Sequence, residues 1–334
     1  MTRAVGGVGR ATGELRGKRI FLSGGAGFIG STLVGRLVDD NEVVVYDSFK
    51  RDSLSGRPYA SHPNLKCIVG DVLHGEAIAR AMQGAEIVVH LAAVAGVDTV
   101  IKSPTTTMEV NLLGTHNFLR AAHALPRCER AVTFSTSEVF GTYAYRVSES
   151  DTVTTGAVGE ARWIYAVSKL AGEHMTYAYY KEFGLPAASI RPFNVYGPGQ
   201  IGEGAIHVFV MRALRGEDLE IHGEGDQIRS WTYIDDMVDG VLRVMARPQA
   251  VGESFNIGNP RGTVTINALA ELVIAVTGSR SKIVHVPRPG VDVELRIPSI
   301  EKARSLLEFS PRVDLREGLE RTVAWYRMSR PDPV

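Results

Sequence analysis

The sequence predicts an α/β protein, with a doubly wound parallel sheet followed by a smaller C-terminal α/β lobe. Up to residue 192, short runs of β-branched and apolar residues alternate with helical stretches, as is typical of βαβ units. A glycine-rich segment, residues 24–30, directly follows the first of these runs and precedes a helical pattern. After residue 192 the apolar runs are shorter and prolines are more frequent, so we expect a second lobe there.

The expected strands and helices follow each other in the order that a parallel sheet requires. The first strand, Lys18–Ser23, leads into the glycine-rich segment and then into a helix at Phe28–Val38. Apolar runs of the kind found in buried parallel strands follow at Glu42–Asp47, Leu65–Val69, Glu86–Ala92, Arg130–Ser135 and Ala187–Arg191. Helices are expected at Pro104–Ala124, Ile164–Phe183, Ser299–Leu307 and Leu315–Met328.

Composition and charge argue against several classes of protein. Lysine plus arginine and aspartate plus glutamate number 37 each, so no net charge favours nucleic acid or an anionic membrane as a partner. No apolar run approaches the roughly 20 residues that a membrane-spanning helix needs. Cys67 and Cys128 lie in apolar contexts and are expected to be buried thiols, which favours a cytoplasmic protein. The nine histidines show no metal-ligand spacing, so no metal is expected.

The glycine-rich segment has the pattern of a dinucleotide-binding loop. Gly24, Gly27 and Gly30 are spaced Gly-x-x-Gly-x-x-Gly between a strand and a helix. This spacing allows a tight turn, close approach of the backbone to a pyrophosphate, and tight packing of the helix on the strand. The pyrophosphate would lie at the start of the helix, beside Phe28 and Ile29, where free N–H groups and the helix dipole favour an anion.

Acidic residues after the next two strands indicate which dinucleotide is bound. Asp47 ends a strand about 20 residues after the glycines, where an acid binds a ribose hydroxyl. A carboxylate there repels a 2′-phosphate, which favours NAD, although Lys50 and Arg51 leave NADP as an alternative. The pair Asp71-Val72 is placed to meet the adenine edge, and capping of the next helix explains this aspartate equally well.

These features divide the chain into three regions. Residues 1–17 are rich in glycine and contain no apolar stretch, so we expect a disordered leader and not a signal peptide. Residues 18–192 form the expected NAD-binding Rossmann domain, and residues 193–334 form the substrate lobe. Residues 231–258 are expected to return to the main sheet.

Tyr165 and Lys169 lie one helical turn apart in the helix expected at Ile164–Phe183. At this spacing the ammonium group can lie near the phenol and favour its ionised form. A phenolate within reach of an alcohol is a general base, and a bound dinucleotide is the complementary redox partner. Together with the glycine loop, the pair predicts an NAD-dependent oxidation of a secondary alcohol.

Several stretches resemble the extended short-chain dehydrogenase/reductases that modify nucleotide sugars. The resemblance covers nearly the whole chain and includes the glycine loop, Leu91–Ala93, Asn111–Thr115, Ser135–Gly141, Tyr165 with Lys169, and Arg191–Asn194. It implies that Tyr165 removes the proton of the sugar C4 hydroxyl, that Thr136 acts beside it, and that Lys169 holds the nicotinamide ribose. It also implies contacts to the cofactor from Leu91, Ala92 and Ala93.

Within this group the chain is most similar to the UDP-glucuronate decarboxylases, which are UDP-xylose synthases. The similar segments are Ser135–Glu138, Arg162–Lys169, Arg229–Trp231 and Arg296–Ile300. The resemblance implies oxidation at C4, loss of carbon dioxide from the 4-keto sugar, and either reduction to UDP-xylose or release of the 4-keto form. Ser137 and Glu138 would lie at the sugar, and Glu138 with Arg229 would position the carboxylate and reprotonate C5.

Three alternatives remain. Ala92–Val97 resembles the corresponding loop of nucleotide-sugar 4-epimerases. Nucleotide-sugar 4,6-dehydratases usually have an aspartate where this chain has Ser137, but the GDP-mannose dehydratases resemble it with serine and glutamate. The third alternative is a dinucleotide sensor without activity, which the joint presence of Thr136, Tyr165 and Lys169 disfavours.

The remaining predictions concern the substrate and the partner subunit. Arg191, Arg229 and Arg288 are candidates for binding the diphosphate of a nucleotide sugar, because guanidinium forks suit phosphate oxygens. Asn194 is placed to bind the diphosphate or the sugar. By analogy with related enzymes, the two longest expected helices would pair across a homodimer.

Overall fold

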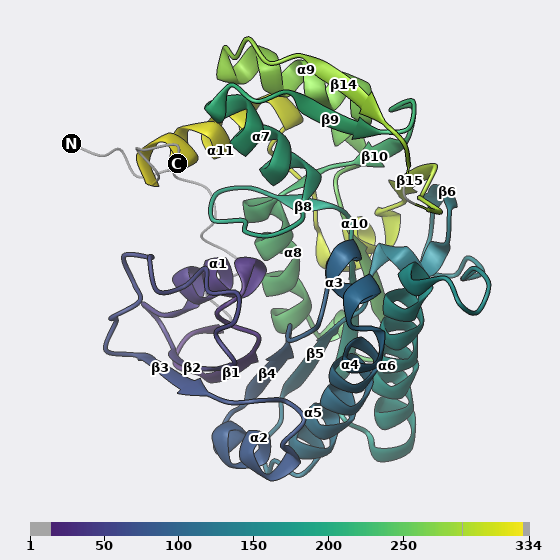
Figure 1. The fold of residues 1–334 in the computed structure, drawn as a ribbon. Helices are drawn as coiled ribbons and strands as arrows, with labels where there is room; N and C mark the ends of the chain where they lie inside the picture. The colour runs from purple at the N-terminus through teal and green to yellow at the C-terminus, as the bar shows by residue number, and fades with distance from the viewer. Residues whose placement is uncertain (1–14, 289, 330–334) are drawn as a thin grey trace.

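The computed structural model describes residues 15–288 and 290–329, and its centre is a seven-stranded parallel sheet (Figure 1). The strand order is β12-β7-β5-β4-β1-β2-β3, so the doubly wound fold predicted from the sequence is confirmed. The order changes direction between β1 and β4, and such sheets bind ligands beyond the carboxyl ends of the strands at this point. The strands are β1 (Arg19–Ser23), β2 (Glu42–Asp47), β3 (Leu65–Val69), β4 (Ile87–His90), β5 (Arg130–Phe134), β7 (Ala187–Pro192) and β12 (Ser254–Ile257).

Helices cover both faces of this sheet, because alternate residues of a strand point to opposite sides. Ile20 and Leu22 of β1 contribute to one apolar core together with α1 and α8. Phe21 contributes to a second core with α2 and α5, and α6 packs beside α5 (Figure 1). These helices are α1 (Phe28–Leu37), α2 (Gly75–Met82), α5 (Gly114–His123), α6 (Ala161–Phe183) and α8 (Ile234–Ala246).

The long helix predicted at Pro104–Ala124 is interrupted. After α3 (Val97–Lys102) the chain forms α4 (Pro104–Met108), a π-helical turn η2 (Glu109–Leu113) and then α5. Within the π turn, the buried side chain of Asn111 accepts the N–H of Val94 at 2.8 Å and donates to its carbonyl oxygen at 3.1 Å. These bonds fix the segment that follows β4.

The second lobe contains a sheet that takes one strand from the N-terminal half of the chain. Its order is β13-β10-β15-β6, and β6 (Tyr143–Val147) precedes residue 192. Conversely, β12 and α8 lie in the C-terminal half and belong to the main sheet and its helical layer. The two lobes are therefore interleaved, and a single boundary near residue 192 does not separate them.

The remaining elements complete the second lobe and its connections. The strands are β8 (Val195–Tyr196), β9 (Leu219–His222), β10 (Ile228–Ser230), β11 (Thr232–Tyr233), β13 (Thr263–Thr265), β14 (Ile283–Val286) and β15 (Leu295–Pro298). The helices are η3 (Ser137–Phe140), α7 (Ala205–Arg215), η4 (Pro248–Ala250), η5 (Pro260–Gly262), α9 (Ile266–Thr277), α10 (Glu301–Leu307) and α11 (Leu315–Ser329).

Two sequence predictions differ from the structure. Residues 1–14 of the predicted leader lie outside the described residues, but Leu15 is only 2% exposed and belongs to the main core. The N–H of Gly17 donates to the carbonyl oxygen of Asp40, so the folded body begins before Lys18. The prediction of a buried thiol at Cys67 is wrong, because β3 is the outermost strand of the sheet and leaves this side chain exposed.

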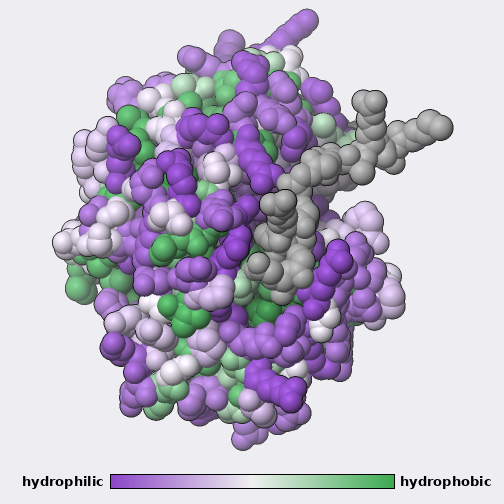
Figure 2. All heavy atoms as spheres, turned by 180° about the vertical axis from the view of Figure 1, so that it is seen from behind, coloured by the Kyte–Doolittle hydropathy of each residue, from purple (hydrophilic) through white to green (hydrophobic). Residues whose placement is uncertain are grey.

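Within the part of the chain that the structure describes, none of the helices combines the length and the apolar character that crossing a bilayer requires. On the face seen in Figure 2, hydrophobic residues form small patches separated by hydrophilic ones.

Candidate active site

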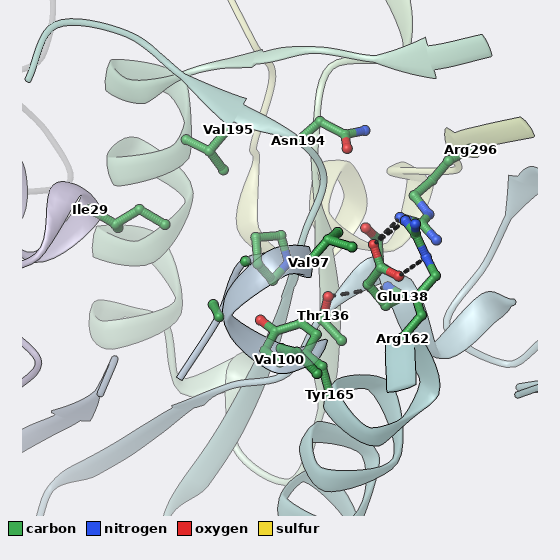
Figure 3. A pocket seen from close by; sticks show the side chains of 14 residues that line it. Ile29, Val97, Val100, Thr136, Glu138, Arg162, Tyr165, Asn194, Val195 and Arg296 are labelled. Carbon is green, nitrogen blue, oxygen red and sulfur yellow. Dashed lines mark hydrogen bonds and ion pairs between the residues drawn. The ribbon is translucent and has the colours of Figure 1, made fainter. Parts of the chain in front are cut away.

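A cavity of about 270 Å³ lies beyond the carboxyl ends of the main sheet strands, where the second lobe faces them. Ile29 of α1 lies toward one end of this cavity, and Arg296 of β15 lies toward the other (Figure 3). The volume approaches the lower end of the range for small-molecule sites, about 300–1,000 Å³. The lining residues are Ile29, Ala95, Gly96, Val97, Val100, Thr136, Ser137, Glu138, Arg162, Tyr165, Pro192, Asn194, Val195 and Arg296.

Thr136 and Tyr165 lie next to each other and both line the cavity, with Tyr165 drawn below Thr136 in Figure 3. Thr136 follows β5, and its hydroxyl oxygen caps η3 by accepting the N–H of Glu138 at 3.1 Å. Burial, together with the charge of Glu138, raises the pKa of Tyr165 to about 12, while a hydrogen bond with Thr136 acts in the opposite direction. The protein alone therefore keeps the phenol protonated at neutral pH.

Lys169 follows Tyr165 by one turn of α6, and its side chain is buried. Burial lowers the pKa of Lys169 to about 8, while the nearby Glu173 opposes this shift. The sequence predicts that this ammonium lowers the pKa of Tyr165. In the chain alone, burial raises the pKa of the phenol, so a lowering of this pKa by Lys169 stays a prediction.

Glu138 is held as an anion by two arginines. Its carboxylate accepts a hydrogen bond from Arg296 at 2.7 Å and two from Arg162 at 3.2 and 3.3 Å (Figure 3). Burial favours the neutral acid, but the two guanidinium groups outweigh it and lower the pKa of Glu138 to about 2. A carboxylate in this state can orient a substrate, but at neutral pH it has no proton to donate and is a weak base.

Asp292 extends this arrangement to a third arginine. Its Oδ1 atom accepts hydrogen bonds from Arg162 at 3.0 Å, from Arg229 at 3.3 Å and from the N–H of Val293 at 2.7 Å. Arg229 also donates to the carbonyl oxygens of Ile228 and Val293. Burial lowers the pKa of Arg229 to about 10, although Asp292 acts to raise it. We call Glu138, Asp292, Arg162, Arg229 and Arg296 the arginine cluster.

Not all of the predicted substrate residues reach the cavity. Asn194 does, in a left-handed conformation with φ of 35°, and its amide donates to the carbonyl oxygen of Ser230 at 2.9 Å. Arg191 is instead buried in an ion pair with Glu173, with an N–O distance of 2.7 Å. Arg288 forms an exposed pair with Glu294. Arg229 pairs with Asp292 and is not among the residues that line the cavity, whereas Arg296 lines the cavity and pairs with Glu138, the role expected of Arg229 from the sequence.

The glycine loop forms a cradle that larger residues would fill. Gly24 has a φ of +76°, and a Cβ atom there would lie 2.3 Å from the backbone nitrogen of Ala92. A Cβ atom at Gly30 would lie 2.6 Å from the carbonyl oxygen of Gly24. The helix α1 begins after Gly27 without a side-chain cap, so its first N–H groups suit a phosphate.

Asp47 fixes this loop and keeps capacity to bind a ribose. Its two carboxylate oxygens accept the N–H groups of Ala26 and Phe49, each at 2.9 Å. Burial raises the pKa of Asp47, and these N–H groups oppose the shift. Because a carboxylate can accept about four hydrogen bonds, two ribose hydroxyls could still be bound. The loop and Asp47 together fit a dinucleotide.

The other predicted cofactor residues surround this cradle. Asp71 accepts the N–H of Leu73 at 3.0 Å in a turn, and α2 begins later, at Gly75, so Asp71 is not the N-cap of that helix. Val72 packs in the second core. Phe28 begins α1, and Leu91, Ala92 and Ala93 follow β4 directly, half-buried. Contacts of these residues with the adenine or the nicotinamide remain predictions.

The described residues contain no group of three or more histidine, cysteine, aspartate or glutamate side chains that could hold a metal ion.

Comparison with known proteins identifies the family. Residues 20–258 match the model of the NAD dependent epimerase/dehydratase family. The chain belongs to this family. It is therefore an NAD-dependent enzyme, and the assignment of the glycine cradle as its cofactor site stays a prediction. This membership confirms the predicted cofactor and sets aside the sensor without activity.

Individual members of the family are similar over almost the full chain. The chain is 34% identical to a UDP-N-acetyl-alpha-D-glucosaminuronate decarboxylase of Bacillus cytotoxicus, over 93% of this chain and 98% of that protein. It is 36% identical to UDP-glucuronic acid decarboxylase 3 of Arabidopsis thaliana, over 90% of this chain and 86% of that protein. The solved structure of UDP-glucuronic acid 4-epimerase from Bacillus cereus, with UDP-glucuronic acid and NAD, has a TM-score of 0.85 and 29% identity, and the match covers 93% of this chain and 99% of that chain.

Arg162, Arg296 and Asn111 belong to motifs of the sequence, but their motifs alone predict no role for them. Asp292 was not identified at all. The signal available for Arg296 was its position beside a proline in a segment that resembles the decarboxylases. Its pairing with Glu138 spans 158 residues, so local spacing could not indicate it.

Proposed function

We propose that this enzyme decarboxylates UDP-glucuronate through a 4-keto intermediate, giving UDP-xylose or its 4-keto form. The observation that carries the proposal is the ion pairing of Glu138 with Arg162 and Arg296, in the same cavity as Thr136 and Tyr165. A cationic group beside the predicted base suits a sugar that carries a carboxylate at C6. The similarity to two decarboxylases of nucleotide-linked uronates supports the same substrate class.

The proposed reaction begins at Tyr165, which removes the proton of the C4 hydroxyl. When bound, NAD would supply the acceptor for a hydride from C4, and the positive charge of its oxidised ring would favour the phenolate. Lys169 holds the nicotinamide ribose and keeps a positive charge near the phenol. This arrangement would offset the burial that raises the pKa of Tyr165 in the chain alone.

The later steps depend on the C4 ketone, which is β to the C6 carboxylate. The bond between C5 and C6 breaks and carbon dioxide leaves. The electron pair of this bond stays on C5 and is delocalised onto the ketone oxygen. Thr136 and Tyr165 are the donors that would stabilise the resulting enolate. Protonation at C5 and reduction at C4 then complete the cycle. Glu138 is ionised in the chain alone, and a substrate carboxylate that shares its arginines would raise its pKa toward the range of a proton donor.

A 4-epimerase that acts on UDP-glucuronate is the second candidate. The segment Ala92–Val97 resembles epimerases, and three of its residues, Ala95, Gly96 and Val97, line the cavity. A loop in this position can decide whether the 4-keto sugar loses its carboxylate or rotates before reduction. Dehydration is less well supported, because Ser137 lines the cavity where an acid would be needed.

Incubation of the purified, NAD-loaded enzyme with UDP-glucuronate tests the proposal. Release of carbon dioxide and formation of UDP-xylose or its 4-keto form, followed by mass spectrometry and NMR, are expected. UDP-galacturonate without loss of mass would favour the epimerase, and loss of water from a nucleotide hexose would favour a dehydratase. Glu138→Gln should retain some C4 oxidation but block the later steps; full activity would refute its role.

We further propose a cytoplasmic homodimer that binds its UDP-sugar without nucleic acid or membrane. The side chains of Ile101, Leu113, Tyr177 and Phe183 are each about half exposed on α3, η2 and α6. Burial of these apolar groups against a second copy would stabilise a dimer. Sedimentation of the wild type as a dimer, and of Leu113→Asp as a monomer, is expected; a monomeric wild type would refute the dimer. Fractionation of the source cells tests the compartment.

A further inference from the structure

The arginine cluster has one positive charge in excess. Arg162, Arg229 and Arg296 are joined by ion pairs to two carboxylates, Glu138 and Asp292. Three cations and two anions leave a net charge of +1 in a largely buried place, which favours binding of a further anion. Arg162 and Arg296 line the cavity, so that anion would arrive from the cavity side.

The three arginines differ in what holds them. Arg296 also donates to the carbonyl oxygen of Gly141, and Arg229 donates to the carbonyl oxygens of Ile228 and Val293. In the hydrogen bonds seen among the described residues, Arg162 is held by carboxylate side chains alone. A bond to one carboxylate can be exchanged for a bond to another with little change in chemistry, so Arg162 is the arginine that a substrate carboxylate can recruit.

Recruitment of Arg162 would leave no buried anion without a partner. Glu138 would keep Arg296 at 2.7 Å. Asp292 would keep Arg229 at 3.3 Å and the N–H of Val293 at 2.7 Å. Because an unpaired buried charge is the main cost of breaking such a pair, the cluster is built so that Arg162 can change partners at low cost.

We propose that Arg162 is the residue that selects a carboxylate at C6 of the sugar, and that Asp292 occupies it until the substrate binds. This inference rests on the proposed function only for its substrate class, a nucleotide-linked uronate.

The position of Arg162 supports the C6 group over the diphosphate. Arg162 and Tyr165 are three residues apart on α6 and both line the cavity, so they share a helix face. If Tyr165 acts at C4, a neighbouring group contacts a substituent of C3 or C5, and of these the C6 carboxylate on C5 is the one that carries a negative charge. The diphosphate is attached to C1, on the opposite side of the sugar ring.

Binding of matched ligands tests the role of Arg162. The NAD-loaded enzyme with Tyr165→Phe, which prevents turnover, is titrated calorimetrically with UDP-glucuronate and with UDP-glucose, which lacks the C6 charge. Adding Arg162→Met should weaken UDP-glucuronate binding roughly 10- to 100-fold, as expected for loss of a charge-assisted hydrogen bond, and change UDP-glucose binding by less than about twofold. Equal losses for both ligands, or no loss for either, would overturn the proposal.

A matched control separates this effect from general damage. Arg243 is 12% exposed and pairs with Asp239, much as Arg162 is 15% exposed and pairs with Glu138, but Arg243 lies on α8 and outside the residues that line the cavity. In the same background, Arg243→Met should leave the affinity for both ligands unchanged. If Arg243→Met loses as much affinity for UDP-glucuronate as the Arg162 variant, then loss of any buried ion pair is enough to weaken binding, and the effect is not specific to Arg162.

Asp292→Asn provides an independent test that does not remove an arginine. If Asp292 competes with the substrate for Arg162, the variant should bind UDP-glucuronate roughly two- to fivefold more tightly and leave UDP-glucose unchanged. Weaker binding of both ligands would show that Asp292 only supports the fold and would overturn its proposed role. This variant also decides the matter if Arg162→Met does not fold.

The outcomes distinguish this inference from the proposed function. The wild type could convert UDP-glucuronate to UDP-galacturonate while Arg162→Met loses affinity for UDP-glucuronate alone. The proposed decarboxylation would then be wrong, and the inference about Arg162 would stand. If the wild type releases carbon dioxide but Arg162→Met binds both ligands as before, the function stands and the inference fails.

Discussion

The two sides of the cavity are built in different ways. On the cofactor side, where Ile29 lines the cavity, one contiguous segment, Gly24–Gly30, is proposed to bind the dinucleotide through its backbone, and Asp47 fixes this segment. On the sugar side, the arginine cluster is assembled from side chains of η3, α6, β10, β15 and the loop before β15. The first side therefore depends on the space that its glycines leave, and the second depends on the balance of charge between distant segments.

The largest effect is expected where the two sides meet, at Tyr165. Tyr165→Phe removes the proposed base and should lower turnover by about 10³-fold, within the range for loss of a general base. NAD affinity, measured by fluorescence titration, should stay within about twofold. Tyr180→Phe, a change of the same kind near the far end of α6, should keep full activity. Normal turnover of the Tyr165 variant would mean that another group takes the proton.

On the sugar side, removal of one charged group of the arginine cluster should lower the stability of the fold. Arg296→Met leaves Glu138 with one of its two guanidinium partners and opens a gap beside a buried carboxylate. The free energy of unfolding, measured with urea, should fall by about 3–5 kcal/mol. The exposed pair of Arg304 with Glu301 offers a control, since Arg304→Met should cost less than about 1 kcal/mol. Similar small losses in both variants would argue against a strongly coupled cluster.

On the cofactor side, NAD affinity should fall when a side chain is added to the glycine loop. Gly24→Ala places a methyl group against the backbone of Leu91 and Ala92 in a left-handed conformation, and NAD affinity should fall at least about tenfold. Gly278→Ala is the matched control, because Gly278 has a φ of +65° but open space around its Cβ position. It should lose some stability and keep its NAD affinity. If both variants bind NAD equally well, the close contact with β4 does not shape the cradle.

The smallest effect is a dependence of stability on acid pH. The pKa of Glu138 is lowered from its ordinary value of 4.5 to about 2 in the folded chain, so the unfolded chain takes up this proton first as the pH falls. The stability that Glu138 contributes is therefore present above about pH 4.5 and is lost as the pH falls toward 2. Urea unfolding of Glu138→Gln should show a weaker fall in stability across this window than the wild type. Identical slopes would contradict the lowered pKa.

The cofactor side could be predicted from the sequence because its signals are local. The spacing of Gly24, Gly27 and Gly30 and the distance to Asp47 all lie within one strand-helix-strand unit. Six of the seven strands of the main sheet were predicted with small errors at their ends for the same reason, and β12 was predicted only as part of a region, residues 231–258, that returns to the sheet. The exposure of Cys67 was not predicted, because the residue pattern of a strand does not reveal whether that strand lies at the edge of a sheet.

The sugar side could be predicted only in part. Thr136, Glu138 and Tyr165 were identified through their motifs, but the pairing of Glu138 with Arg296 joins residues 158 positions apart. Arg191 has the guanidinium group expected of a diphosphate ligand, but Glu173 on α6 already neutralises its charge. Which arginine remains available to a ligand depends on the tertiary positions of the acids, and the sequence pattern does not contain this information.

The exchange of strands between the lobes has a consequence for how such an enzyme can change during evolution. A fragment that ends near residue 192 would lack the outer partner of β7 and the helix α8, and the remainder would lack β6 beside β15. Neither piece is a transferable module, so recombination of whole domains would disrupt both. New sugar preferences must instead arise by point changes in the loops and strand ends around the cavity, while the two intertwined sheets are kept intact.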